Sequence, residues 1–323
     1  MKSAVISGIS GQDGAYLTKF LIENKYKVIG LTRSSNNIAS QKFRYLGINE
    51  GVYIEECDLL DFSSIIRLIE KYQPDEFYNL AAQSSVASSF HQPIGTINFN
   101  IHSVLNVLEA IRLVSPKTKY YQASSSEMYG HVSNLPITEE TVLNPLSPYG
   151  ISKASGHWIV RNYRDSYGVF ASSGILFNHE SFLRENTFFV KKVIQSAIQI
   201  KNGKQKNLYV GNIDIKRDFG YAPEYIKAMH LIIQHEIPDD FIICSGESIF
   251  LRDVINYVFE VIGISINKVI VDPKLFRPTE ILDIYGSNEK AKSNLNWNYD
   301  LRFFDVLDLL IREEIDAQDK SVI

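Results

Sequence analysis

The chain has 323 residues, 45% of them hydrophobic, and a formal net charge of −4 with acidic and basic residues mixed along its length. This balance argues against nucleic acid or an anionic membrane surface as the main partner. The two cysteines, Cys57 and Cys244, belong to no C-x-x-C motif, so we expect neither a disulfide framework nor a metal site.

The apolar runs of the chain are short. None reaches the roughly 18 residues of a membrane span, and the run Ala4–Ile6 meets glycine too soon to be the core of a signal peptide. We therefore expect a cytoplasmic protein. A chain of this length can form two domains or one large α/β domain.

Three glycines follow that first apolar run, and an amphipathic stretch begins at Tyr16. Their spacing, G-x-x-G-x-x-G between a predicted strand and a predicted helix, is typical of a dinucleotide-binding turn. A helix N-terminus offers free N–H groups and a positive dipole end to phosphate. The residues expected at a cofactor are Gly8, Ser10, Gly11, Gln12, Asp13 and Gly14. The alternative is a glycine-rich turn that binds nothing.

The next apolar run, Tyr26–Leu31, ends in Thr32-Arg33-Ser34-Ser35. In a dinucleotide fold this strand end faces the adenosine ribose, and an acidic residue there selects NAD. Here an arginine and hydroxyl residues stand in that place, which favours NADP. A surface arginine in a loop is the alternative interpretation.

Predicted strands and helices then alternate: strands near 52–54, 76–80 and 119–123, and helices near 63–72 and 94–114. This pattern indicates an α/β fold with a Rossmann-type, doubly wound parallel sheet. Ligands of such sheets bind at the carboxyl ends of the strands. Small residues after the strand 76–80 would let a cofactor approach the backbone, namely Leu80, Ala81, Ala82, Gln83 and Ser84. Asp58 could reach an adenine amino group, although a turn or capping aspartate is the commoner case.

Four residues with acid–base chemistry follow the strand 119–123. If the backbone stays extended, Ser125 and Glu127 point to the same side. Tyr149 and Lys153 stand four residues apart at the start of a predicted helix that reaches about Tyr167. A tyrosine loses its proton near pH 10, and a nearby ammonium favours the phenolate, so the pair is a plausible acid/base near neutral pH. Capping by the Ser/Glu cluster and a core tyrosine are the alternatives.

The remainder of the chain is predicted to build a smaller lobe. We expect residues 1–178 to form the NADP-binding domain, with 213–247 returning to it, and residues 179–212 and 248–323 to form a nucleotide-sugar-binding lobe. Predicted helices cover about 187–200, 223–234 and 303–315, and a strand covers 241–244. Lys192, Arg217 and Arg277 are cations that this lobe could direct at a diphosphate, although solvated surface charge is the usual role of each. We assign His179 no proton-transfer role.

Taken together, the glycine turn, the Ser-Ser-Glu strand tip and Tyr149-x-x-x-Lys153 resemble the extended short-chain dehydrogenase/reductase group. Within it, four stretches resemble the GDP-mannose 4,6-dehydratases over nearly the whole chain: Gly8–Gly14, Gly174–Ser181, Gly211–Asp218 and Phe276–Glu280. The resemblance implies a GDP-sugar 4,6-dehydratase that recycles NADP internally. It also implies a homodimer or homotetramer.

The resemblance implies roles for individual residues. Ser125 would bond the sugar 4-hydroxyl, Glu127 would be the acid/base at carbons 5 and 6, and Tyr149 would take the 4-hydroxyl proton. Lys153 would tune Tyr149 and hold the nicotinamide ribose. The residues matching NADP contacts are Arg33, Ser34, Asp58, Leu59, His179 and Arg184. The residues matching nucleotide-sugar contacts are Asn178, Lys192, Arg217, Arg277 and Glu280.

Two departures from the family pattern concern single positions. Serine stands at position 125 where the family usually has threonine, and one arginine stands near position 33 where it usually has two. The missing arginine belongs to a loop used in tetramer contacts. GDP-N-acetylglucosamine and GDP-manno-heptose stay open as substrates. A nucleotide-sugar epimerase or reductase and a non-catalytic NADP sensor also stay open as functions. Glu127 argues against the epimerase and the reductase.

Overall fold

The computed structural model describes residues 1–33, 40–48 and 50–319. Its main feature is a seven-stranded, wholly parallel sheet in the order β10-β6-β5-β4-β1-β2-β3. The strands of this sheet are β1 Ser3–Ser7, β2 Lys27–Thr32, β3 Val52–Glu56, β4 Glu76–Asn79, β5 Lys119–Ser125, β6 Ala171–Leu176 and β10 Asp240–Ile243. The prediction of a Rossmann-type doubly wound α/β fold is confirmed.

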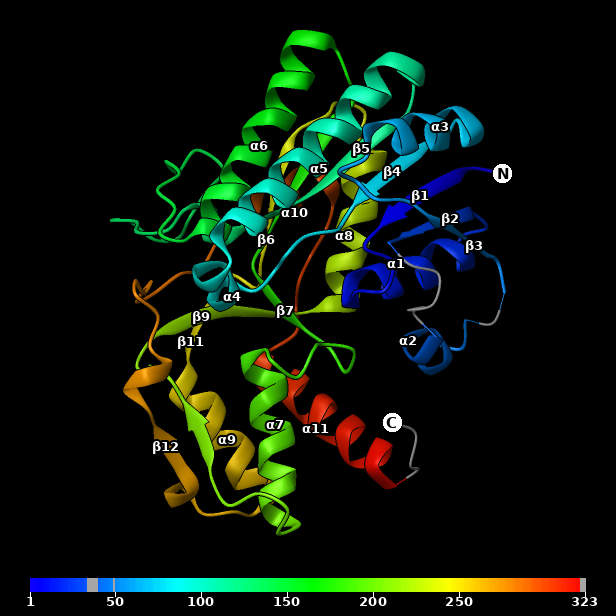
Figure 1. The fold of residues 1–323 in the computed structure, drawn as a ribbon. Coiled ribbons are helices and arrows are strands. Elements are labelled where there is room, and N and C mark those ends of the chain that lie inside the picture. The colour runs from blue at the N-terminus through cyan, green and yellow to red at the C-terminus, as the bar shows by residue number, and fades with distance from the viewer. Residues whose placement is uncertain (34–39, 49, 320–323) are drawn as a thin grey trace.

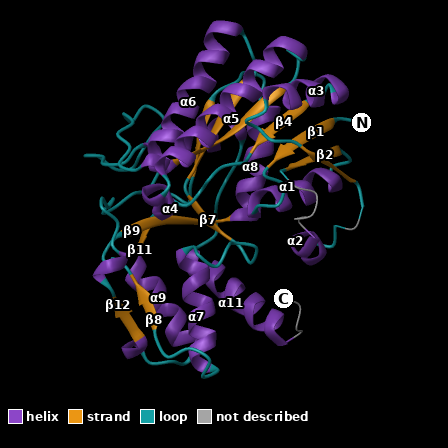
Figure 2. Ribbon diagram, viewed as in Figure 1, coloured by secondary structure: helices purple, strands orange, loops and turns teal. Residues whose placement is uncertain are grey.

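Helices cover both faces of this sheet (Figures 1 and 2). On one face lie α3, α5 and α6; on the other lie α1 and α8. The helices of the chain are α1 Gln12–Glu23, α2 Ser40–Tyr45, α3 Phe62–Tyr72, α4 Val86–His91, α5 Pro93–Val114, α6 Pro148–Tyr167, α7 Phe189–Lys201, α8 Ala222–Gln234, α9 Leu251–Ile262, α10 Glu289–Leu295 and α11 Phe303–Asp319.

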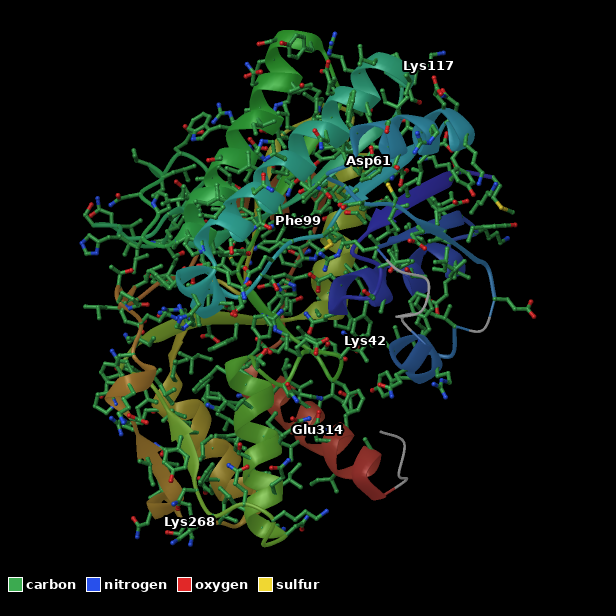
Figure 3. All side chains as sticks on the ribbon, viewed as in Figure 1. Lys42, Asp61, Phe99, Lys117, Lys268 and Glu314 are labelled. Carbon is green, nitrogen blue, oxygen red and sulfur yellow. The ribbon has the colours of Figure 1, made fainter. Side chains whose placement is uncertain are left out.

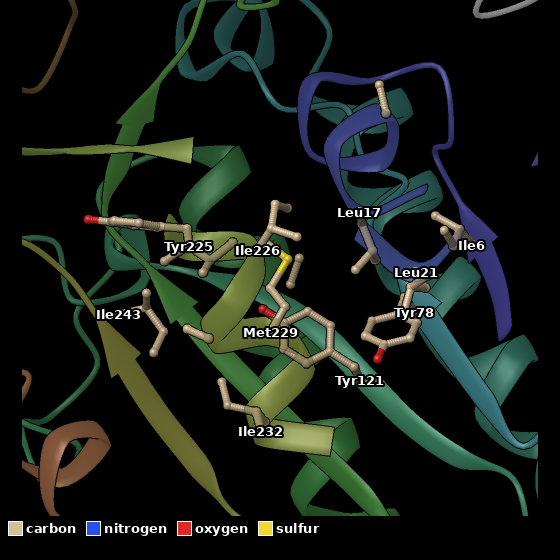
Figure 4. Close-up of a cluster of buried hydrophobic side chains, with 14 of the residues drawn as sticks. Ile6, Leu17, Leu21, Tyr78, Tyr121, Tyr225, Ile226, Met229, Ile232 and Ile243 are labelled. Carbon is tan, nitrogen blue, oxygen red and sulfur yellow. The ribbon is translucent and has the colours of Figure 1, made fainter. Parts of the chain in front are cut away.

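Figure 4 shows the core beneath α1 and α8, where side chains of both helices meet those of the sheet. Leu17 and Leu21 of α1 and Met229 of α8 pack there against Tyr78 and Tyr121. Each of these five side chains is fully buried. Burial of side chains this large contributes roughly 1.5–3 kcal/mol apiece, so this contact fixes the position of α1 on the sheet.

A second hydrophobic core lies where α7, α9 and α11 pack together, in the lower part of the molecule as Figure 1 shows it. A three-stranded sheet, in the order β11-β9-β7, lies between this core and the large sheet. Its strands are β7 Asn178–Glu180, β9 Lys216–Tyr221 and β11 Ser248–Phe250, and a further pair is β8 Leu208–Val210 with β12 Val269–Val271. The sequence analysis did not predict these short strands.

Most predicted elements have their expected type. The helix predicted near 94–114 begins at Pro93, and the predicted helix 223–234 begins at Ala222. The condition that the backbone stays extended through Glu127 is not met, because β5 ends at Ser125 and a 3₁₀ turn, Ser126–Met128, follows. The short side chain of Ser125 favours this turn, because its hydroxyl accepts a hydrogen bond from the Glu127 amide at 3.3 Å and so caps the turn.

Candidate active site

The glycine turn forms the floor of a cavity of about 680 Å³, here called the turn cavity. Gly8 has φ +71°, and a Cβ atom there would lie 2.8 Å from the Ala81 nitrogen. A Cβ on Gly14 would lie 2.3 Å from the Gly8 carbonyl oxygen. The N-cap residue of α1, Gly11, contributes no side-chain cap. Positions 8 and 14 thus tolerate no side chain, and the turn presents helix N–H groups, as a diphosphate site requires.

A second cavity of about 430 Å³ lies between the carboxyl edge of the sheet and α7, here called the interlobe cavity. Residues common to both cavity walls show where the two meet: Asp13, Leu80, Ala82, Ser84, Arg184 and Phe188. A long ligand and a second ligand can therefore lie end to end along this edge. This is where the carboxyl ends of parallel strands place a binding site.

The four predicted catalytic residues all line the interlobe cavity. Ser125 ends β5, and Glu127 stands in the 3₁₀ turn that follows. Tyr149 and Lys153 stand on the first turns of α6, whose start is fixed by Pro148 and by Ser147, the Oγ of which accepts from the Gly150 amide at 3.0 Å. The structure thus brings a hydroxyl, a carboxylate, a phenol and an ammonium to one wall.

Lys153 is almost wholly buried, and its Nζ donates to the Ala123 carbonyl at 2.7 Å. Burial lowers the pKa of Lys153 to about 8, opposed by the charge of Asp13. The ammonium lies 5.8 Å from the centre of the Tyr149 ring. This places the cation near the phenol, as Y-x-x-x-K spacing on a helix dictates.

The expectation of a lowered Tyr149 pKa is wrong for the ligand-free protein. Burial raises the pKa of Tyr149 to about 12; a side-chain hydrogen bond with Ser125 acts against this rise and the Glu127 carboxylate adds to it. The phenolate is disfavoured because the side chain is buried and a carboxylate lies nearby. The sequence spacing placed the ammonium correctly but held no information on burial.

The predicted nucleotide-sugar residues also line the interlobe cavity. Arg217 of β9 is 6% exposed, and its Nη1 donates at 2.7 Å to the carbonyls of Lys216 and Ile281. Its Nη2 has no hydrogen-bond partner among the described residues, and Glu280 lies 3.8 Å away. An unpaired buried N–H is costly, so Arg217 is poised for an anionic ligand.

Three other predicted nucleotide-sugar residues, Lys192, Asn178 and Arg277, contact backbone carbonyls or a neighbouring side chain. Lys192 Nζ donates to the Tyr209 carbonyl at 2.7 Å, and burial lowers its pKa. Asn178 Nδ2 donates to the Asp218 carbonyl at 3.3 Å. Arg277 Nη1 lies 3.8 Å from a Glu127 oxygen. Three cations therefore face one cavity in which a catalytic carboxylate candidate also lies.

Most of the predicted cofactor residues line the turn cavity: Gly8, Ser10, Gly11, Gln12, Asp13, Gly14, Arg33, Leu59, Leu80, Ala81, Ala82, Ser84 and Arg184. Asp58 and Gln83 line neither cavity. Asp58 accepts a hydrogen bond from the Leu60 amide at 3.0 Å, a turn role, and the Gln83 amide donates to Asn100 of α5 at 2.8 Å. Ser34 lies outside the described residues.

His179 lines the interlobe cavity, with both ring nitrogens bonded within the protein. The side chain of Gln12 is also engaged: Nε2 donates to Asp13 at 3.0 Å and to the His179 carbonyl at 3.2 Å, and Oε1 accepts from Ser181 at 2.7 Å. These bonds tie the start of α1 to β7 and to Ser181, which follows it. Any contact of Gln12 with a cofactor is therefore left to its backbone.

Sequence reasoning missed several wall residues. Ser85, Val86 and Ala87, at the start of α4, line the interlobe cavity. Continuing the run of small residues past Ser84 would have found Ser85. Phe188 lines both cavities beneath Arg184, whose guanidinium carbon lies 3.7 Å from the ring centre. No spacing or composition signal marks Phe188, the residue that precedes α7, as part of a cavity wall.

Comparisons with solved structures concern the fold. The fold matches a crystal structure of dTDP-glucose 4,6-dehydratase from Bacillus anthracis in complex with NAD, with TM-score 0.87, 18% identity and 100% of both chains covered. It also matches RMD from Pseudomonas aeruginosa complexed with NADPH, with TM-score 0.81 and 22% identity over 97% of this chain and 98% of that one. The chain thus shares its fold with a dTDP-glucose 4,6-dehydratase and with RMD.

The sequence gives the narrower assignment. The family model described as GDP-mannose 4,6 dehydratase matches residues 5–310. A GDP-mannose 4,6-dehydratase of Sinorhizobium fredii (strain HH103) is 38% identical over 97% of this chain and 97% of its own length. The chain belongs to the GDP-mannose 4,6-dehydratase family.

Proposed function

We propose that the protein converts a GDP-hexose of the GDP-mannose type to the GDP-4-keto-6-deoxy sugar, with NADP as a cofactor regenerated in each turnover. The observation that supports this most is the convergence of Ser125, Glu127, Tyr149 and Lys153 on a cavity that also receives cations from α7 and β9. A plain dehydrogenase would need the tyrosine and lysine but not Glu127.

The turn cavity fits a dinucleotide. Glycines fill the positions where a Cβ would strike backbone, and the N-cap residue of α1 carries no capping side chain. Gly8, Gly11 and Gly14 would hold the diphosphate, and Lys153 would hold the nicotinamide ribose. The bound group would supply a reversible hydride acceptor for the sugar. Solved relatives of this fold were crystallised with NAD or NADPH.

NADP rather than NAD is favoured by the end of β2, where Thr32 and Arg33 occupy the place of an acidic residue. Arg33 is exposed, and its guanidinium carbon lies 5.8 Å from the ring centre of Phe99, which is labelled in Figure 3. Cation and aromatic ring together suit a 2′-phosphate beside an adenine. Replacing Arg33 with glutamine should lower the preference for NADPH over NADH in a fluorescence titration.

The residues of the interlobe cavity would then divide the chemistry. Tyr149 takes the proton of the sugar 4-hydroxyl, which Ser125 also bonds, while the Lys153 ammonium stabilises the phenolate. Once carbon 4 is a ketone, the hydrogen on carbon 5 becomes acidic. Glu127 removes that proton and passes it to the departing 6-hydroxyl, so that one water leaves. The 4-keto-6-deoxy product is complete when the hydride taken from carbon 4 is returned to carbon 6 and a proton, matching the one that Tyr149 took, is added at carbon 5. Arg217, Lys192 and Arg277 would hold the diphosphate of the substrate.

A product assay tests the proposal. The protein is incubated with NADP and, separately, with GDP-mannose, GDP-N-acetylglucosamine and GDP-manno-heptose, and the products are examined by mass spectrometry. Loss of one water from GDP-mannose supports the proposal, and loss from one of the other two reassigns the hexose. An isomeric product of unchanged mass would indicate an epimerase. Cofactor binding without any product would indicate a sensor.

A further inference from the structure

The first turn of α1 and the strand β7 are joined by a buried contact between Asp13 and His179. The two Asp13 carboxylate oxygens lie 3.1 and 3.0 Å from His179 Nε2. On the other side of the ring, Nδ1 lies 2.7 Å from the Phe177 carbonyl oxygen. The ring also stacks on Tyr225, with centroids 4.7 Å apart, so its plane is fixed.

These partners determine the protonation of the ring. A backbone carbonyl can only accept, so Nδ1 must carry a hydrogen. An ionised carboxylate can likewise only accept, so Nε2 must carry one too. A histidine with two N–H groups is an imidazolium. In agreement, the pKa of His179 is raised: burial acts against the charge, but the Asp13 carboxylate outweighs it.

The carboxylate is held ionised by the same contacts. Burial would raise the pKa of Asp13, but the charge and hydrogen bond of His179 and the amide of Gln12 bring it to about 2. Asp13 also lies in the first turn of α1, where the helix dipole favours a negative charge. The other charged groups that interact with this pair are Arg184, Glu180 and Lys153. The phenols of Tyr149 and Tyr121 also face Asp13.

Asp13 belongs to the walls of both cavities, and Lys153 lines one of them. Within the described part of the chain, the Lys153 ammonium donates to the neutral Ala123 carbonyl and to no carboxylate. Asp13 is the charge that opposes the effect of burial on Lys153. A buried ammonium that lacks a facing anion loses its proton readily, so this carboxylate favours the charged form of Lys153.

We propose that Asp13 and His179 form a buried ion pair whose carboxylate keeps the Lys153 ammonium charged, and that neither side chain is a cofactor ligand. Asp13 is a positioning residue that acts through Lys153, and His179 holds its carboxylate in place. The inference rests on the proposed function only in the role it gives Lys153 at the nicotinamide ribose. It departs from the family resemblance, which implies a cofactor contact for His179.

Two measurements on the whole protein test this inference, and neither needs a sugar substrate. In the first, nitrogen-15 NMR of the ligand-free protein reports the seven histidine rings, with His179→Gln used to assign one and the surface variant His91→Gln as a control. We expect His179 to keep both ring hydrogens at a pH where exposed histidines are neutral, and to lose one in Asp13→Asn. A neutral His179 ring at pH 7.5 in the unaltered protein would overturn the inference.

In the second, NADPH affinity is followed by fluorescence across the pH range around 8, where Lys153 titrates. Asp13→Asn should move the midpoint of this dependence to lower pH. His179→Gln retains a donor for Asp13 and should leave affinity below the midpoint within about twofold. If His179→Gln instead weakens binding about tenfold or more at every pH, or if Asp13→Asn leaves the midpoint unmoved, the inference fails. If the protein dehydrated no GDP-sugar, the proposed function would fail. Both measurements would still show whether the ion pair exists and acts on Lys153.

Discussion

Arg277 Nη1 lies 3.8 Å from Glu127 Oε1, so a cation from the loop after β12 meets the carboxylate that follows β5. If Glu127 is the acid/base at carbons 5 and 6, Glu127→Gln should lower turnover by roughly 10²–10⁴-fold, the usual value of a positioned acid/base. Cofactor affinity should stay unchanged because Glu127 does not line the turn cavity. Turnover equal to that of the unaltered enzyme would rule out the role.

Arg277→Gln provides the matched comparison for Glu127→Gln. The proposed partner of Arg277 is the substrate diphosphate, which does not change charge during the reaction. Loss of such a contact raises KM more than it lowers kcat. We expect KM for the GDP-sugar to rise about tenfold or more, as for a charged hydrogen bond, with kcat within a few-fold. A fall confined to kcat would place Arg277 in the chemistry.

Cofactor binding should depend on the charge of Lys153. Because the pKa of Lys153 is lowered to about 8, the ammonium is present below this pH and is lost as the pH rises through it. We expect NADPH affinity to weaken as the pH rises past 8 and Lys153→Gln to abolish that dependence. The exposed Lys117, labelled in Figure 3, offers the control Lys117→Gln. A Lys153→Gln protein with the original pH dependence would contradict the assignment.

Two glycine substitutions should have opposite effects on stability. A Cβ at Gly14 would lie 2.3 Å from the Gly8 oxygen and 2.6 Å from Ile9 Cα, both backbone atoms, so Gly14→Ala must displace the turn. We expect a loss of about 1–3 kcal/mol in the free energy of unfolding, together with weaker cofactor binding. At Gly95, inside α5, an added Cβ would have no atom of another described residue within 4 Å beyond the helix's own backbone and the adjacent residues.

Because a helical glycine costs backbone entropy and Gly95 has open space beside it, Gly95→Ala should add about 0.5–1 kcal/mol to the free energy of unfolding. Chemical denaturation of both variants, with and without NADP, measures these effects. Equal destabilisation by the two substitutions would show that the close approach at Gly14 does not govern the turn.

Asp218 holds the loops after β10 and before α10. Its carboxylate accepts from the Ser245 amide at 2.8 Å, the Ser245 hydroxyl at 2.7 Å, the Gly246 amide at 3.1 Å and the Gly286 amide at 3.4 Å. Asp218→Ala leaves these donors unpaired, so we expect a loss of about 3 kcal/mol of unfolding free energy. The surface variant Asp305→Asn loses only an exposed ion pair with Arg302 and should change the free energy of unfolding much less.

The same residue gives a pH dependence of stability with a definite sign. Burial raises the pKa of Asp218 from 3.8 to about 6, against the effect of its hydrogen bonds. The folded state therefore binds a proton more readily than the unfolded state does, and the Asp218 contribution to stability falls as the pH rises from about 4 to 6. Comparing unfolding of the original protein with Asp218→Asn across this range isolates the contribution, because asparagine does not titrate.

The sequence was informative where a pattern has a local physical cause. Glycine spacing, alternation of apolar runs and Y-x-x-x-K on a helix predicted the large sheet and placed Tyr149 and Lys153 on one wall. The sequence was uninformative about properties that depend on burial, such as the pKa of Tyr149. The contact between Asp13 and His179 joins residues 166 positions apart, and no spacing rule connects them.

Short elements were the other class of failure. The three-residue strands β7 and β11 are held by backbone pairing with β9. No side-chain pattern in the sequence predicts such pairing. Similarly, a single hydroxyl–amide bond at Ser125 decided that Glu127 lies in a turn rather than on a strand. The homodimer or homotetramer and the domain boundaries expected from the sequence stay predictions.

β10 is the edge strand of the large sheet and, within the described residues, pairs with β6 alone, yet the whole of β7 to α8 separates these partners along the chain. During synthesis, the edge of β6 therefore stays uncovered until the ribosome has released residue 243 and its neighbours. A nascent chain paused before that point would expose unpaired backbone N–H and C=O groups at a hydrophobic edge. A chaperone that holds unfolded chains would bind there. A truncated protein ending soon after β6 should for the same reason be recovered as aggregate.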